Sequence, residues 1–160
     1  FVGTPYILHV LSNYGHTDLA YTLLCRKEYP SWLYAVGKGA TTIWEHWDGI
    51  MENGEFWSTD MNSFNHYAYG SVADWIYEQA AGIRVVEEHP GFEKAWIQPK
   101  PGDQLEWLGA SIETRYGKIS SRWTHIDGTI RYEIVTPVPA QIVIGEKEYA
   151  VEPGKYIFWE

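Results

Sequence analysis

The sequence has almost no cysteine. Cys25 is the only one among 160 residues, which excludes an internal disulfide and a cysteine-based zinc site. Cysteine usage therefore gives no reason to expect an oxidising compartment. His9, His16, His89 and His125 also lack the spacing to carboxylates or to one another that a zinc site needs. We expect neither a metal nor another cofactor.

Positive charge and long apolar runs are scarce as well. The chain has 12 Lys and Arg against 21 Asp and Glu, a formal net charge of −9. Because nucleic-acid binding depends on Lys and Arg that neutralise phosphates, we expect no nucleic-acid partner. No apolar run approaches the roughly 20 residues of a membrane-spanning helix, so we expect no membrane partner. A neutral or small-molecule ligand fits this composition better.

Aromatic residues, in contrast, are abundant. The chain holds 9 Trp and 12 Tyr, and its hydrophobic content of 45% suffices for the core of one ordinary domain or two small ones. Such rings either fill a core or form flat platforms for ligands such as sugars. The number of rings favours a core, and their polar neighbours must decide between the two.

Two helices are predicted near the start of the chain. The first is capped by Thr4 and ends at Gly15, and the second is capped by Thr17 or His16 and ends before Pro30. The predicted apolar faces are Tyr6, Ile7, Val10 and Leu11 in the first helix and Leu19, Leu23 and Leu24 in the second.

A long segment, Tyr29 to Asn62, separates these helices from the clearest one. It is rich in glycine, so we expect mostly loop with a short helix near Ile43–Trp47. Loops of this length are usually functional or disordered, and the aromatic content argues against disorder. The clearest helix is capped by Asn62 or Ser63 and closed by Gly82. Its predicted apolar face is Phe64, Ala68, Val72, Trp75, Ile76 and Ala80.

The hydrophobic period changes to two after Ile83. Alternation as in ASIET at residues 110–114, with frequent turn signals, predicts an antiparallel sandwich or barrel. Asp127-Gly128 predicts a hairpin between strands 120–125 and 129–135. Pro137 and Pro139 are expected at a sheet edge or at a crossing between sheets. The helical part cannot easily close a core around itself, so it is expected to be the end of something larger.

Five sequence blocks carry a resemblance to a known family. In order and spacing they resemble the C-terminal end of bacterial α-L-rhamnosidases of glycoside hydrolase family 78. The resemblance is specific over residues 1–83 and looser up to Glu160. The blocks are FVGTP at residues 1–5, YGHTDLAY at 14–21, YPSW at 29–32, GATTIWEHWD at 39–48 and MNSFNHYAYG at 61–70.

The resemblance implies both fold and partners. Residues 1–83 would be the last helices of an (α/α)6 catalytic barrel, and residues 84–160 a C-terminal antiparallel β-sandwich. The fold class is therefore α+β by segment. The rest of the barrel would belong to an N-terminal part of the same polypeptide, absent from this sequence. The substrate would be a rhamnose-containing oligosaccharide or glycoside.

The resemblance also implies roles for residues. It implies inverting hydrolysis of terminal α-L-rhamnosyl groups, with the general base at Glu45 and a sugar-contacting histidine at His66. Trp44 and Trp47 would provide apolar walls for the sugar ring. The family more often has Arg where this chain has His46, so His46 receives no role. The general acid belongs to an upstream block with no counterpart here.

The residues by themselves leave plainer interpretations open. An aromatic-flanked glutamate such as Glu45 is more often a surface or capping residue, and His66 could bond the cap of its helix. The loop acids could hold substrate hydroxyls, but such residues are usually solvated. They are Asp48, Glu52, Glu55 and Asp60.

Two other function classes compete with an enzyme. A carbohydrate-binding module would use tryptophans on the β face, for instance Trp96, Trp107 and Trp123, and a structural module would only support a neighbouring domain. As it stands, the chain contains the predicted base without the acid, so we expect it to be inactive alone. The apolar stripe of residues 64–80 would be left partly uncovered, which favours association with the absent segment or with a second copy as a homodimer.

Overall fold

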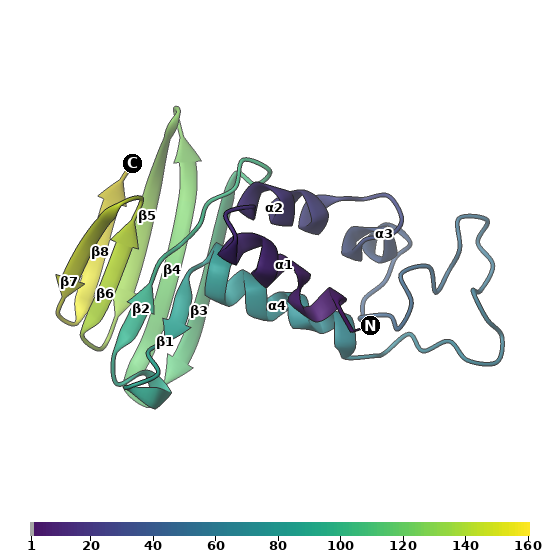
Figure 1. The fold of residues 1–160 in the computed structure, drawn as a ribbon, viewed down its shortest axis with the longest axis horizontal. Coiled ribbons are helices and arrows are strands. Elements are labelled where there is room, and N and C mark those ends of the chain that lie inside the picture. Colours follow the sequence, from purple (N-terminus) through teal and green to yellow (C-terminus); the bar gives the residue numbers. More distant parts are fainter. Residues whose placement is uncertain (1) are drawn as a thin grey trace. The chain divides into compact units, whose positions relative to one another are not determined.

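The computed structural model describes residues 2–160 and divides into two compact units. The first extends to Ala73 and is called the α unit, and the second, Asp74–Glu160, is called the β unit. Figure 1 shows helices and long loops in the first and two sheets in the second. Phe1, the first residue of the FVGTP block, lies outside the described residues. Among the described residues, no helix is long and apolar enough to cross a bilayer.

Both helices predicted near the start of the chain are present. Helix α1 is Thr4–Asn13 and α2 is Thr17–Cys25, with Gly15 at a φ of 82° in the turn between them. Gly3, not Thr4, is the N-cap of α1. Most of the predicted apolar face of α1 is uncovered. Tyr6, Ile7 and Val10 are exposed, while the buried residues of the helix are Leu8 and Ser12.

The long segment contains a helix in an unexpected place. Helix α3 is Trp32–Gly37, and the side chain of Ser31 caps it by accepting a bond from the Tyr34 N–H at 3.0 Å. The short helix predicted near Ile43–Trp47 is absent, because that stretch is an irregular loop. Its backbone groups bond instead to a distant part of the chain, as described below.

The predicted helix from Asn62 to Gly82 is wrong at its beginning. Residues 62–67 are loop, and helical structure begins only with the 3₁₀-helix η1, Ala68–Ser71. The α-helix α4, Val72–Trp75, and the π-helix η2, Ile76–Ala80, follow it. In η2 the Ala81 N–H reaches back five residues to the Ile76 carbonyl at 2.8 Å. Neither Asn62 nor Ser63 caps a helix.

The β unit consists of two four-stranded sheets. One has the order β1-β2-β6-β7 and the other β3-β4-β5-β8. All pairs are antiparallel except β2 and β6, a parallel pair that the sequence pattern did not predict. The strands are β1 Ile83–Val85, β2 Ala95–Ile97, β3 Trp107–Thr114, β4 Gly117–Ile126, β5 Thr129–Thr136, β6 Ala140–Ile144, β7 Lys147–Val151 and β8 Gly154–Trp159, with the 3₁₀-helix η3, Pro90–Phe92, between β1 and β2.

The predicted turns of the β unit are confirmed. Asp127 and Gly128 join β4 to β5 with φ values of 49° and 80°, the positive values that a type I′ hairpin turn requires. Pro137 and Pro139 lie where the chain crosses from one sheet to the other. Alternate residues of the strands form a closed core, with Ile97, Ile119, Trp123, Ile134 and Ile142 fully buried. The predicted fold class, helices followed by a β-sandwich, is confirmed.

Candidate functional site

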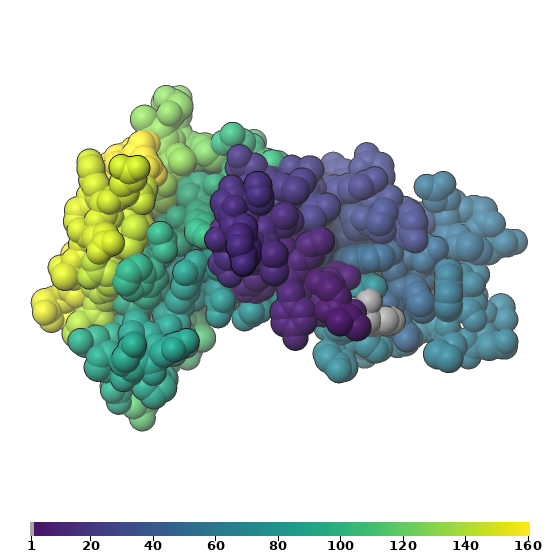
Figure 2. Space-filling view, in the orientation of Figure 1, coloured from purple at the N-terminus to yellow at the C-terminus, as the bar shows by residue number. Residues whose placement is uncertain are grey.

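Two loop segments of the α unit are joined by backbone bonds, and they are the two blocks that carry the candidate residues. The Glu45 N–H donates to the Ser63 carbonyl at 2.9 Å, and the His66 N–H donates to the Ile43 carbonyl at 2.8 Å. The Thr42 hydroxyl donates to the Phe64 carbonyl. Segments 42–45 and 63–66 therefore run beside each other, and Glu45 and His66 lie on neighbouring strands of one loop pair. Figure 2 shows these loops, in blue, at the surface of the α unit.

The Glu45 carboxylate is oriented by a backbone donor. It is partly buried, and its Oε2 accepts a hydrogen bond from the Ser63 N–H at 3.3 Å. A carboxylate fixed through one oxygen can accept a proton with the other. This is the geometry that a general base for water needs.

His66 lies in the loop before η1, not in the first turn of a helix as the sequence suggested. Its Nδ1 accepts a bond from the Ala68 N–H at 3.3 Å, so a neutral ring carries its proton on Nε2. The ring lies parallel to that of Tyr67, with centroids 5.3 Å apart. A backbone donor thus fixes the His66 ring through Nδ1.

The two flanking indoles differ in what they expose. Trp47 is half-buried and stacks on Tyr69 at 4.0 Å, with Trp32 edge-on to it at 4.9 Å. The Trp32 indole N–H donates to the Tyr69 carbonyl at 2.8 Å, which locks this group of three rings. Trp44 is only 6% exposed and packs edge-on against Phe64, so only a small part of it can touch a ligand.

These rings surround an apolar cavity of about 220 Å³ inside the α unit. Its walls include Trp44 and Trp47 together with the side chains of Leu24, Leu33, Val36 and Ile43. The loop that carries Glu45 is thus backed by aromatic and aliphatic packing rather than by regular secondary structure. That packing holds the carboxylate in place although no helix or strand contains it.

The loop acids lie in different surroundings from Glu45. Asp48 is half-buried, whereas Glu52, Glu55 and Asp60 are exposed. Burial, followed by the charges of Glu52 and Asp48, raises the pKa of Tyr34, whose hydroxyl donates to the Ile50 carbonyl at 2.9 Å.

Sequence reasoning missed several residues that shape the site. Ser63 was interpreted as a helix cap, but its backbone holds both the amide and the carboxylate of Glu45. Trp57 stacks on His46 at 3.8 Å, and Asn62 donates from its side chain to the Gly49 carbonyl at 2.8 Å. No periodicity or spacing in the sequence predicts these contacts, because each contact joins loop positions that are far apart in the chain.

Family models match both parts of the chain. The bacterial alpha-L-rhamnosidase 6 hairpin glycosidase domain matches residues 1–80, and the bacterial alpha-L-rhamnosidase C-terminal domain matches residues 82–155. An α-L-rhamnosidase of Streptomyces avermitilis is 45% identical over 128 residues, and one of Formosa agariphila is 40% identical over 137 residues. These alignments include 80% and 86% of this chain but 12% and 15% of the relatives.

Solved structures show the same fold. The Streptomyces avermitilis α-L-rhamnosidase in complex with L-rhamnose superimposes with a TM-score of 0.88 at 35% identity, covering 99% of this chain and 17% of that one. The native enzyme from Aspergillus terreus gives a TM-score of 0.91 at 35% identity, covering 98% and 19%. The chain thus spans less than a fifth of each of these relatives. It belongs to the bacterial α-L-rhamnosidase family.

Proposed function

We propose that this chain supplies the general-base part of the active site of an α-L-rhamnosidase, which hydrolyses terminal α-L-rhamnosyl groups with inversion of configuration. The observation that carries the proposal is the Glu45 carboxylate, fixed through Oε2 on a loop that pairs with the loop of His66. The relatives' activity supports the substrate class. The division into a barrel part, residues 1–83, and a sandwich, residues 84–160, stays a prediction.

In the proposed reaction Glu45 acts on water. Its carboxylate accepts a proton from a water molecule while the water oxygen attacks the anomeric carbon of the rhamnosyl group. A carboxylic acid on the opposite side, about 6.5–9.5 Å away, gives its proton to the leaving oxygen. We assign that acid to an N-terminal part of the polypeptide, which would complete the barrel.

The neighbouring side chains bind the sugar in this proposal. His66 contacts a ring hydroxyl, and Trp47 offers an apolar surface to the C–H groups and the methyl group of rhamnose. Trp44 contributes an edge and mainly supports the loop of Glu45, since so little of it is exposed. Direct recognition therefore falls mostly to His66 and Trp47.

The test is Glu45→Gln in the complete enzyme. The amide keeps the shape but cannot accept the proton, so we expect turnover to fall at least ~100-fold while substrate affinity is kept. Glu28→Gln is the matched control. It makes the same chemical change elsewhere in the α unit, at a side chain that is 80% exposed. His66→Ala should raise KM as well as lower kcat. Turnover of Glu45→Gln within a few-fold of the parent would refute the assignment.

The stereochemistry provides an independent check. Proton NMR at early times should show β-L-rhamnose as the first product from an α-L-rhamnoside, before mutarotation mixes the anomers. The α-anomer as first product would contradict inversion while leaving the substrate class intact. The 160-residue chain alone should show no turnover of p-nitrophenyl α-L-rhamnoside, because it lacks the acid.

A further inference from the structure

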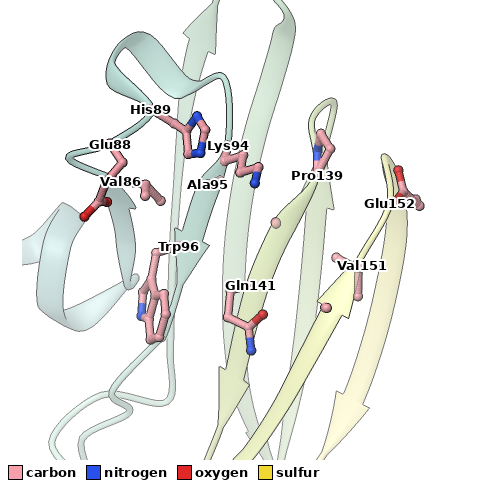
Figure 3. Close-up of a pocket in the computed structure, with 12 residues that line it drawn as sticks. Val86, Glu88, His89, Lys94, Ala95, Trp96, Pro139, Gln141, Val151 and Glu152 are labelled. Atoms are coloured by element: carbon pink, nitrogen blue, oxygen red, sulfur yellow. The ribbon is translucent and has the colours of Figure 1, made fainter.

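Three tryptophans of the β unit are candidates for a second sugar contact, and the structure separates them. Trp123 is 0% exposed and its indole N–H donates to the Ala80 carbonyl at 2.9 Å, so it belongs to the core. Trp107 is exposed, but the Arg122 guanidinium lies 4.1 Å from its ring centroid and covers one face. Trp96 is partly exposed and lines a hollow of about 550 Å³ (Figure 3).

The strand register places Trp96 on the outer face of its sheet. Trp96 on β2 pairs with Arg84 on β1 and with Gln141 on β6, and Gln141 pairs with Ala150 on β7, so the four form one row across the strands. In the next row, Ile97 and Ile142 are fully buried. Side chains alternate along a strand, so the row of Trp96 points away from the core. The Ala150 side chain is short, so it leaves space on the outer face of the sheet beside the larger side chains of Trp96 and Gln141.

Hydrogen bonds fix the polar groups of this hollow. The Trp96 indole N–H donates to Gln98 Oε1 at 3.3 Å, and Gln141 Nε2 donates to Glu148 Oε2 at 3.1 Å. The second bond sets the orientation of the Gln141 amide. Its carbonyl oxygen is then the group that can accept a bond from a ligand hydroxyl.

The rim carries charges of both signs. Figure 3 shows His89 and Lys94 above Trp96, with Val151 and Glu152 on the other side of the hollow. Glu88 adds a second carboxylate. Two carboxylates against one lysine disfavour an anionic ligand, whereas a lysine donor and carboxylate acceptors both suit neutral hydroxyls. The rim therefore selects against phosphates and uronates.

We propose that this hollow, lined by Trp96, Gln141, Ala150 and Val151, is a binding site for a neutral pyranose, separate from the site of Glu45. A sugar ring has an apolar C–H face that packs on an indole and a border of hydroxyls that needs fixed donors and acceptors. The volume lies within the usual range of about 300–1,000 Å³ for small-ligand sites. The site would hold a second sugar residue of a saccharide without taking part in hydrolysis.

The experiment is saturation-transfer difference NMR on the 160-residue chain, with methyl α-L-rhamnoside and methyl α-D-glucoside as probes and methyl α-D-glucuronoside as the anionic comparison. We expect signals from the neutral glycosides, with Kd on the order of 1 mM, and weaker signals from the uronoside. Trp96→Ala should weaken binding about 10-fold. Trp107→Ala is the matched control and should leave binding unchanged.

A second variant protects the test from a folding defect. Gln141→Ala keeps the indole and the alanine floor, and circular dichroism should show the parent fold while binding weakens at least ~3-fold. Methyl α-D-glucoside decides the test, because the rhamnoside could also bind beside Glu45. Glucoside binding that persists in both Trp96→Ala and Gln141→Ala, or a preference for the uronoside, would overturn the proposal. Folded protein without any glycoside signal would overturn it as well. None of these outcomes bears on Glu45, which is tested by turnover.

Discussion

The two units differ in how they hold their chemistry. The β unit has continuous ladders of strands and a core of fully buried residues. The α unit carries the candidate catalytic residues on irregular loops joined by a few hydrogen bonds, and α1 leaves Tyr6, Ile7 and Val10 exposed. Regular structure thus dominates where no reaction is proposed. The loops with the candidate residues are held by aromatic packing.

The largest effect that follows from this contrast concerns the core of the β unit. Trp123→Ala removes a fully buried indole and leaves the Ala80 carbonyl without its donor, so we expect a loss of about 3–5 kcal/mol in the free energy of unfolding. Urea denaturation followed by circular dichroism measures it. Trp159→Ala, at a residue that is 58% exposed, should cost less than about 1 kcal/mol. Equal losses in the free energy of unfolding for the two variants would contradict the difference between core and surface.

A smaller effect in the same core depends on pH. Tyr132 donates to Glu160 Oε2 at 2.6 Å, and burial, together with this bond, raises the pKa of the Tyr132 phenol far above its ordinary value. Stability from a raised pKa is complete below the unfolded value, about 10, and is lost as pH rises beyond it. Tyr132→Phe should therefore cost about 1–3 kcal/mol at pH 7 and progressively less above pH 10.

Denaturation curves at pH 7 to 11 would measure this difference. The control is Tyr14→Phe, because Tyr14 is 78% exposed and its loss should change the stability at no pH. A Tyr132→Phe deficit that stays constant across the alkaline range would show that the phenol does not lose its proton on unfolding there.

The loops of the α unit should respond locally rather than globally. Asn62→Ala removes the bond from its side chain to the Gly49 carbonyl, worth about 1 kcal/mol. We expect hydrogen exchange at the backbone amides of Glu45 and His66 to accelerate roughly 5-fold, since they join the same loop pair. Amides of β4 and β5 should not change. Acceleration throughout the chain would contradict a local response.

The smallest expected change in stability lies on α1. Replacing Ile7 and Val10 by Glu should alter the free energy of unfolding by less than about 0.5 kcal/mol per site, because both are exposed. The parent chain should bind a hydrophobic dye or sediment above its monomer mass, and the variant should do so several-fold less. Ile157→Glu in the β unit is the control. A parent chain that is monomeric and does not bind the dye would refute the expectation that the exposed side chains of α1 form a sticky apolar surface.

Sequence reasoning succeeded where a local signal decides the structure. The Asp127-Gly128 turn needs positive φ at both positions, and few residues tolerate that as well as Asp and Gly. It failed where bonds to distant parts of the chain override the local signal. Ser63 and Asn62 have side chains that are suited to capping a helix. Segment 62–66 bonds instead to segment 42–49, so the helical structure begins only at Ala68.

The same reasoning explains what was predictable in the site. Glu45 and His66 could be proposed because they lie in recognisable blocks, and the pairing of those blocks could not, since nothing in either block encodes the other. The hydrophobic period predicts the apolar face of α1, but it does not tell which segment covers that face. A stripe meant for a neighbouring segment gives the same period as one meant for the chain's own interior.

The π-helical turn at Ile76–Ala80 suggests where the chain can tolerate the deletion of one residue. A turn that reaches back five residues instead of four contains one residue more than an α-helix would use over the same rise. Loss of the exposed Tyr77 would convert it into an ordinary α-helical turn and leave both flanking segments in phase. Natural variants that differ by a single deletion should therefore accumulate at this position, whereas a deletion in β4 or β5 would turn every inward side chain outward.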